Sequence, residues 1–204
     1  NDYLKENLVN ITLGVTHKFT DKLSFNATYL NSSYDEDLRE HNQANAYVKL
    51  ADGSQSPSRI LMQCLIRQRH FRNNSFNTYF NYDVTTGSLR HRILLGYDYF
   101  QMAQQAGSSA MTAGGYLLKD GTTTTVFKPA NIARYVLDAD GNPKTNVPYY
   151  DLTSNDNNIE RDYSKYVFVS TALSPYLQYS HGIYLQEQLE AGPVKLLLGI
   201  RQEF

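Results

Sequence analysis

The stretch that decides the fold runs from Gly182 to Arg201 and reads GIYLQEQLEAGPVKLLLGIR. Its two arms meet at Ala191-Gly192-Pro193, a short run typical of the turn of a β-hairpin. One face of the second arm is wholly apolar and the other carries charge; the first holds Val194, Leu196, Leu198 and Ile200, and the second Lys195, Leu197, Gly199 and Arg201. This alternation is typical of a strand with lipid on one side and water on the other.

Composition favours a β-rich chain. Its 204 residues include 17 Tyr and 9 Phe, a formal net charge of −1 and a single cysteine, Cys64. The near-neutral balance provides no basic field for nucleic acid, so we expect no nucleic-acid partner. One cysteine cannot form an internal disulfide. No apolar run approaches the ~20 residues of a membrane-spanning helix.

The same two-faced pattern recurs along the chain. It predicts six strands, near residues 8–19, 23–31, 60–84, 89–101, 177–190 and 194–204. Periodicity is lost over 32–59 and 102–176, which we interpret as two long polar loops. Arg67 to Arg72 is too charged for lipid and is expected to extend into water as strand. Within the second loop, residues 116–127 predict a small hairpin around Asp120-Gly121.

The connections between these strands differ in length in a regular way. Short turns follow the first, third and fifth strands, and long loops follow the second and fourth. Antiparallel transmembrane β-barrels have short periplasmic turns and long extracellular loops in this alternation. Six strands cannot close a membrane barrel, whose smallest bacterial single-chain form has about eight. We therefore interpret residues 1–204 as a partial all-β barrel within a longer protein, whose other strands lie outside this segment.

The alternation also assigns the residues that should face lipid. They are Val9, Ile11, Leu13, Val15, Phe25, Ile93, Leu95, Leu196, Leu198 and Ile200. Glu187 is the exception, because strict alternation places it in line with Ile183, Leu185 and Leu189. Either Glu187 lies close to a membrane interface, where the cost is small, or a β-bulge shifts the register there.

Other chemistry finds little support in the sequence. The five histidines, His17, His41, His70, His91 and His181, have no metal-site spacing, and Cys64 has no companion. The run from Asp138 to Asn142 lacks the later Glu of a calcium loop and is interpreted as a plain turn. We expect no catalytic site, no metal site and no resident cofactor.

Three stretches resemble strands of TonB-dependent siderophore receptors. Leu89 to Tyr99, which reads LRHRILLGYDY, resembles the strand before a large loop in that family. Gly182 to Leu189 followed by Lys195 to Arg201 resembles the hairpin after that loop, and Val15 to Tyr29 is similar to an earlier hairpin. The resemblance covers most of the chain except the loops.

The resemblance implies a 22-stranded outer-membrane barrel of a Gram-negative bacterium, with a plug domain that this segment lacks. Such a receptor imports a ferric siderophore with energy from the TonB complex, which would act through parts outside this segment; iron would be carried as substrate. Aromatic and cationic residues of the long loop are then the candidates for ligand contact: Tyr116, Phe127, Arg134, Tyr135, Tyr149, Tyr150 and Arg161. Each could instead pack the loop onto itself. Alternatives are a receptor for an oligosaccharide or cobalamin, a passive porin, and a soluble binding or adhesin-like sandwich.

Overall fold

The computed structural model describes residues 2–155 and 161–204. The polar run Asp156-Asn157-Asn158 of the predicted second loop lies outside the described residues. Helix content is small, and no helix among the described residues is long and apolar enough to cross a membrane.

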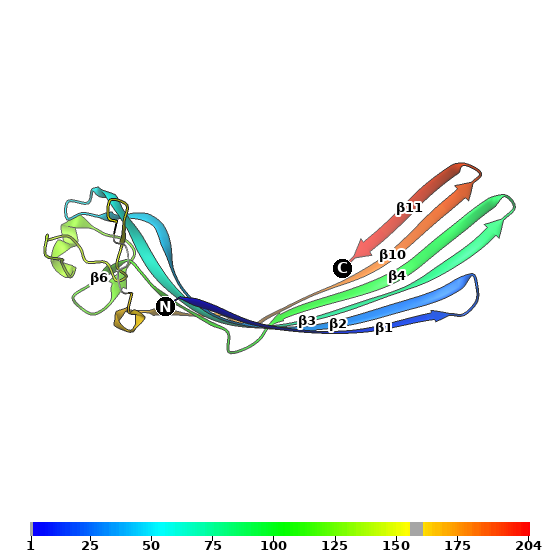
Figure 1. The fold of residues 1–204 in the computed structure, drawn as a ribbon, viewed down its shortest axis with the longest axis horizontal. Coiled ribbons are helices and arrows are strands. Elements are labelled where there is room, and N and C mark those ends of the chain that lie inside the picture. Colours follow the sequence, from blue (N-terminus) through cyan, green and yellow to red (C-terminus); the bar gives the residue numbers. More distant parts are fainter. Residues whose placement is uncertain (1, 156–160) are drawn as a thin grey trace. The chain divides into compact units, whose positions relative to one another are not determined.

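Six long strands form the main sheet. They are β1 (Tyr3–Lys18), β2 (Leu23–Lys49), β3 (Gln55–Thr86), β4 (Leu89–Gln104), β10 (Tyr176–Ala191) and β11 (Val194–Glu203). Their order in the sheet is β1-β2-β3-β4-β10-β11, as Figure 1 shows, and the registered pairs β3–β4, β4–β10 and β10–β11 are antiparallel. The predicted all-β antiparallel architecture is confirmed. The sheet runs from edge strand β1 to edge strand β11 and does not close on itself within the described residues.

The short turns lie where the sequence predicts them. Residues 19–22 join β1 to β2, 87–88 join β3 to β4, and 192–193 join β10 to β11. Gly87 and Gly192 have φ of 61° and 57°. Only glycine adopts this left-handed conformation without a steric penalty, which is why each two-residue turn contains one.

Shorter elements fill the second long connection. They are β5 (Ser109–Ala113), β6 (Tyr116–Leu117), β7 (Thr123–Thr124), η1 (Pro129–Arg134), β8 (Tyr150–Asp151), η2 (Tyr163–Lys165) and β9 (Val169–Ala172). β6 and β7 pair around Gly121, which has a φ of 84°, so the small hairpin predicted at 116–127 is present. β5 and β8 pair with β3, and β9 pairs with β5.

The first predicted loop, 32–59, is largely strand. β2 continues to Lys49 and β3 begins at Gln55, so the irregular part is the turn over 50–54. Polar side chains can occupy both faces of a strand when they bond across to a neighbour. Here Glu36 on β2 accepts hydrogen bonds from Arg67 Nε at 2.7 Å and Arg69 Nη2 at 2.7 Å on β3. Apolar and polar residues no longer alternate over this region, but the two strands continue through it.

The chain divides into two compact units. The loop unit comprises Asn1–Glu6, Glu36–Arg69 and Gly107–Leu173, and the strand unit comprises Asn7–Asp35, His70–Ala106 and Ser174–Phe204. The strands β1, β2 and β3 contribute residues to both.

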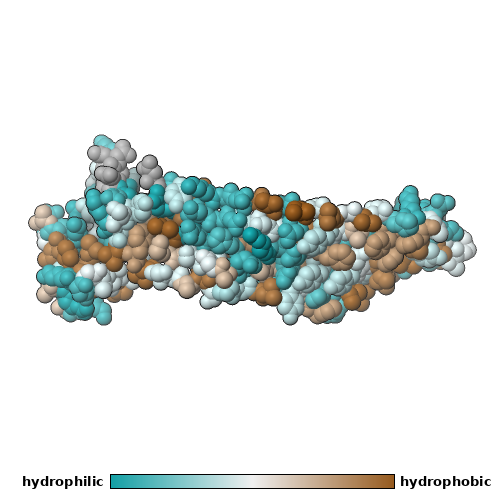
Figure 2. All heavy atoms as spheres, turned by 90° about the horizontal axis from the view of Figure 1, so that it is seen from below, coloured by the Kyte–Doolittle hydropathy of each residue, from teal (hydrophilic) through white to brown (hydrophobic). Residues whose placement is uncertain are grey.

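The strand unit has two chemically different faces. Residues directly opposite each other across strands share a face. The register therefore aligns one row of Phe80, Leu95, Leu185 and Ile200, and on the opposite face a row of Tyr79, Gly96, Tyr184 and Arg201. We name these the apolar face and the polar face. Leucine and isoleucine side chains of the apolar face are exposed, among them Leu95 at 50% and Ile200 at 71%. Figure 2, which shows one side of the molecule, shows apolar side chains on the surface along the strands.

The register also answers the question posed by Glu187. Pairing of β10 with both β4 and β11 is continuous through Glu187, which lies opposite Ile93 and Leu198. No β-bulge occurs there. Glu187 Oε1 lies 2.6 Å from Nδ1 of His91, one row closer to the short turns on the same face. The carboxylate therefore has a polar partner on the apolar face, and its position at an interface stays a prediction.

On the polar face, two long side chains lie over glycines of a neighbouring strand and bond to the strand beyond it. A Cβ at Gly96 would lie 2.2 Å from the Tyr184 ring, and one at Gly182 would lie 2.6 Å from Arg201 Nη2. Tyr184 accepts a hydrogen bond from Asn77 Nδ2 at 3.0 Å, and Arg201 donates to Asp98 at 2.7 and 3.0 Å. These two contacts tie β3 to β10 and β4 to β11, in each case across one intervening strand.

Candidate ligand-binding site in the loop unit

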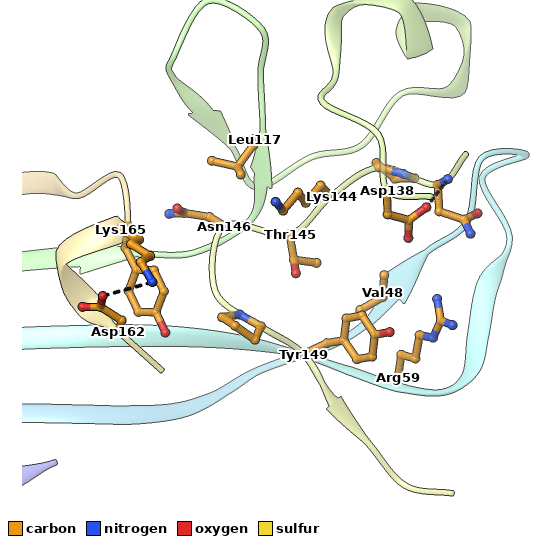
Figure 3. Close-up of a pocket in the computed structure, with 14 residues that line it drawn as sticks. Val48, Arg59, Leu117, Asp138, Lys144, Thr145, Asn146, Tyr149, Asp162 and Lys165 are labelled. Atoms are coloured by element: carbon orange, nitrogen blue, oxygen red, sulfur yellow. Dashed lines mark hydrogen bonds and ion pairs between the residues drawn. The ribbon is translucent and has the colours of Figure 1, made fainter. Parts of the chain in front are cut away.

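The loop unit contains a pocket of about 440 Å³ (Figure 3). Its apolar wall comprises Val48, Leu117, Pro143, Pro148, Tyr149 and Tyr166. Its charged groups are Arg59, Lys144, Lys165, Asp138 and Asp162. A concave, mostly apolar wall with a few charged groups is the usual composition of a small-molecule site.

Arg59 and Tyr149 form one side of the pocket. The Arg59 guanidinium lies 4.8 Å from the centre of the Tyr149 ring, a cation–π geometry. Arg59 Nε is also 3.9 Å from Asp151 Oδ2 on β8. Arg59 comes from β3 and Tyr149 immediately precedes β8, whose Tyr150 and Asp151 pair with Ile60 and Arg59. The short ladder therefore positions both side chains.

Asn146 joins two segments of the pocket wall through hydrogen bonds. Its amide donates to the Val167 carbonyl at 2.8 Å and accepts from the Val167 N–H at 3.0 Å. This pair holds the segment containing Pro148 and Tyr149 against the segment containing Tyr166. Asn142 adds a second anchor, since its side-chain carbonyl accepts from the Ala51 N–H at 3.1 Å.

Both carboxylates of the pocket accept hydrogen bonds from nearby backbone N–H groups in local turns. Asp138 Oδ1 accepts from the Asp140 and Asn142 N–H groups at 3.0 and 2.9 Å, so the run 138–142 is a hydrogen-bonded turn. Asp162 precedes η2, and hydrogen bonds from the Ser164 hydroxyl and N–H hold the pKa of its carboxyl below its ordinary value. Lys165 Nζ lies 3.3 Å from Asp162. Lys144 forms no ion pair with any described residue, and the charged side chains that line the pocket are three cations and two carboxylates.

Tyr166 lines the pocket, and its hydroxyl is buried below the surface. Its hydroxyl oxygen is buried and has no hydrogen-bond partner within the described part of the chain. Burial raises the pKa of the Tyr166 phenol to about 12. The phenol therefore stays protonated at neutral pH. Together the cations, the aromatic rings and the apolar wall of the pocket suit an organic molecule that carries anionic groups.

Three of the predicted ligand-contact residues lie together in the hydrophobic core of the loop unit. Tyr116 and Tyr135 are 2% and 4% exposed. Phe127 packs between them, with ring centroids 5.7 Å from Tyr116 and 4.9 Å from Tyr135. The Tyr116 hydroxyl accepts from the Lys49 N–H at 2.8 Å, which fixes the loop to the end of β2.

The other four predicted residues are dispersed. Tyr149 lines the pocket, and Tyr150 on β8 is exposed. Arg134 ends η1 and lines a second, polar cavity of about 390 Å³. Arg161 is half-buried, and its Nε and Nη2 have no hydrogen-bond partner among the residues that the structure describes. The structure thus brings Tyr149 alone of the seven to the larger pocket, and ligand contact by all seven stays a prediction.

Sequence reasoning missed most of the pocket. Arg59, Lys144 and the adjacent pair Lys165 and Tyr166 come from three separate segments with no shared periodicity. The local signal was the run from Asn142 to Tyr150, NPKTNVPYY, in which prolines and tyrosines flank a lysine. No cluster of three His, Cys, Asp or Glu side chains that could hold a metal occurs in residues 2–155 and 161–204.

Comparison with known proteins finds similar chains among solved structures. No family model and no curated protein matches the chain. Among solved structures, the chain is similar to the crystal structure of the siderophore receptor PiuA from Acinetobacter baumannii, with a TM-score of 0.61 and 16% sequence identity. The match covers 99% of this chain and 26% of that receptor, so this chain spans about a quarter of the receptor's length. At this identity the likeness shows the fold alone.

Proposed function

We propose that this chain is part of an outer-membrane, TonB-dependent receptor that imports ferric siderophores. The observation that carries the proposal is the strand unit, a single sheet with one exposed apolar face and one hydrogen-bonded, charged face. A sheet of this kind needs lipid on the first side and water on the second. The similarity of fold to a siderophore receptor supports the same assignment.

In this proposal the strand unit is barrel wall and the loop unit lies on the extracellular side. The remaining strands, the plug domain and the segment that contacts the TonB complex belong to the rest of the protein. The contribution of this chain is therefore the capture of ligand rather than energy coupling. No covalent chemistry is assigned to it, since iron enters and leaves as part of the chelate.

The pocket of the loop unit supplies the ligand-contact surface. Tyr149 and Tyr166 offer aromatic faces to an organic shell, and Arg59 and Lys144 offer positive charge to anionic groups on it. Tyr150, Arg134 and Arg161 are proposed as further contacts, while Tyr116, Phe127 and Tyr135 support the loop from its core. Ligand contact by these three requires the loop unit to open.

The first experiment is to locate the native protein that carries this segment, with an antibody to residues 102–175. The proposal expects a band much heavier than 23.3 kDa in the outer membrane, with expression that rises when iron is scarce. A soluble band near 23.3 kDa would contradict it and favour a binding sandwich.

Uptake then tests the pocket. Cells that carry a Lys144→Ala, Tyr149→Ala variant of the whole protein should take up less radiolabelled iron from a ferric siderophore at low concentration than wild-type cells. Lys119→Ala, at an exposed lysine of the same unit that lines neither this pocket nor the cavity beside Arg134, is the control. Equal uptake by both variants and wild type would remove the pocket from the proposal.

A further inference from the structure

We propose that the second cavity of the loop unit, beside Arg134, is a binding site for a small organic anion with a phosphate or carboxylate head and an apolar body. The inference goes beyond the proposed function, because it gives this cavity a ligand of its own, separate from the ligand of the larger pocket. Arg134 and Lys128 bind the head of this anion. The site lies wholly within the loop unit.

The second cavity combines apolar walls with positive charge. Its volume of about 390 Å³ falls within the range of small-molecule sites. Its lining residues are Leu118, Thr124, Val126, Lys128, Asn131, Arg134 and Tyr135. No carboxylate is among them, whereas the lining of the larger pocket includes Asp138 and Asp162. The second cavity therefore favours a ligand of negative charge more clearly than the larger pocket does.

Both cations of the second cavity are available to a ligand. Lys128 and Arg134 are exposed, and neither forms an ion pair with a residue that the structure describes. The stretch 116–137 contains three cations and a single carboxylate, that of Asp120. The pKa of Asp120 is lowered mainly by hydrogen bonds from Thr122 and to a lesser degree by the charge of Arg134. Asp120 does not line the cavity, so the two cations there have no anionic partner within it.

Hydrogen bonds hold the walls of this cavity in place. The hydroxyl of the buried Tyr135 accepts from the Lys128 N–H at 3.1 Å and donates to the Val126 carbonyl at 3.2 Å. Thr124 Oγ1 accepts from the Val126 N–H at 3.3 Å and donates to the Val126 carbonyl at 3.2 Å. Leu118 forms a β-bridge with Tyr135. The walls are therefore formed before a ligand arrives, which lowers the entropic cost of binding.

The backbone of Arg134 is fixed at the end of η1. Its carbonyl accepts from the Lys119 N–H at 2.9 Å, which joins η1 to the hairpin of β6 and β7. At the start of η1, Pro129 packs against the turn between β2 and β3, where a Cβ at Gly53 would lie 2.6 Å from the Pro129 ring. η1 is thus held at both ends. A guanidinium matches the paired oxygens of a carboxylate or phosphate, and the Lys128 ammonium adds a second positive charge.

The apolar wall decides which kind of anion fits. It consists of Leu118, Val126 and Tyr135, and Val126 is 59% exposed. An inorganic ion would leave this wall in water, whereas an organic body covers it. The Asn131 amide, which has no hydrogen-bond partner within residues 2–155 and 161–204, adds a donor and an acceptor at the same cavity. We therefore assign the site to an organic anion rather than to inorganic phosphate.

The test measures anion binding by the whole protein. Isothermal titration calorimetry with phenyl phosphate compares wild type with a Lys128→Ala, Arg134→Ala variant. Neither side chain bonds to another described residue, so the variant should fold like wild type, which circular dichroism checks. We expect binding by the variant to be weaker by a factor of about ten or more, because two charge-assisted contacts are lost. Arg134→Lys keeps the charge without the paired donors and should bind with intermediate affinity.

Two controls separate contact in this cavity from general charge and from the larger pocket. Lys119→Ala removes an exposed lysine of the same stretch that lines neither cavity. Lys144→Ala, Tyr149→Ala changes the larger pocket alone. Both variants should bind phenyl phosphate as tightly as wild type. Loss of binding in the second control would place the anion in the larger pocket and contradict the site proposed here.

The remaining outcomes decide the class of ligand and its independence. Equal binding by wild type and the Lys128→Ala, Arg134→Ala variant, or no binding by wild type, would overturn the site. Equally tight binding of inorganic phosphate would contradict an organic ligand. Displacement of phenyl phosphate by a ferric siderophore would mean that Arg134 contacts the siderophore and that the cavity has no separate ligand. The proposed function is tested independently, by location in the outer membrane and by iron uptake.

Discussion

The two units of the chain place their apolar side chains in opposite ways. All the buried apolar residues among those described belong to the loop unit: Leu38, Val48, Leu61, Met62, Cys64, Ala113, Tyr116, Tyr135 and Val147. In the strand unit, the rows containing Leu95, Leu185, Leu198 and Ile200 are exposed. One unit is built like a water-soluble domain with its own core. The other has its apolar surface outside, which is stable only where lipid replaces water.

Apolar side chains of one chain are therefore buried in one unit and exposed in the other. In the loop unit, removal of an apolar ring should leave a cavity. In the strand unit, the important distinction is which face a side chain occupies, because neither face is packed against a protein layer among the described residues.

The largest effect is expected in the core of the loop unit. Tyr116→Ala removes a ring that contacts Phe127 and Tyr135 and leaves the Lys49 N–H without its acceptor. We expect a loss of about 3 to 5 kcal/mol in the free energy of opening this unit, measured by native-state hydrogen exchange. Tyr150→Ala, at an exposed tyrosine, should change it by less than about 0.5 kcal/mol. Similar losses for both would mean that the unit has no such core.

The next effect separates the two faces of the strand unit. Leu198→Arg on the apolar face should destabilise the assembled protein by about 2 to 4 kcal/mol if the site is near the membrane midplane. Leu197→Arg, one residue away on the polar face and 62% exposed, should be tolerated. The amount of heat-resistant protein in the outer membrane measures both. Equal tolerance at the two positions would contradict the assigned faces.

A third effect concerns acid and the loop unit. Burial alone would raise the pKa of Glu36, but hydrogen bonds from Arg69 and Arg67 outweigh it and lower that pKa from 4.5 to about 2. A lowered pKa stabilises the folded unit fully above pH 4.5 and progressively less as the pH falls toward 2. The change amounts to about 3 kcal/mol at most. Hydrogen exchange across this range should show the loss in wild type, and Glu36→Gln should abolish this pH dependence.

The smallest effect tests the crossing side chains of the polar face. Gly96→Ala places a methyl group 2.2 Å from the Tyr184 ring, so Tyr184 must leave Asn77. We expect a cost of about 1 to 3 kcal/mol in denaturant unfolding. Gly199→Ala, whose new Cβ would lie 3.9 Å from the nearest atom, should cost less. A reversed order would mean that Tyr184 does not cross β4 as described.

The strand unit could be predicted from sequence because a single physical pattern determines it. Apolar side chains every second residue, as at Ile93 and Leu95 or Leu196 and Leu198, specify a strand and its exposed face together. The extension of β2 and β3 into 32–59 could not be predicted this way. Polar side chains of β2 and β3 in this region form hydrogen bonds with each other, such as that of Glu36 with Arg67. Residues so far apart in the sequence leave no periodic pattern.

The pocket could not be predicted for a related reason. Val48, Arg59, Lys144 and Tyr166 meet because hydrogen bonds of Asn146 and Asn142 and the ladder of β3 with β8 join distant segments. Composition identified the aromatic residues of the loop, but a buried ring such as Tyr116 and a pocket ring such as Tyr149 have the same local signature. Their places depend on tertiary packing.

In the proposed receptor the apolar face contacts lipid and the polar face contacts water. The most direct test of this arrangement is a cysteine scan of residues 194–201 in the whole protein, with spin-label accessibility measured in membranes. Cys64 is fully buried, and burial raises the pKa of its thiol to about 11, so it should add little background. We expect accessibility to alternate along the strand, with labels at 194, 196, 198 and 200 accessible to oxygen and labels at 195, 197, 199 and 201 accessible to a water-soluble relaxant. Uniform access to the water-soluble relaxant along the strand would contradict it.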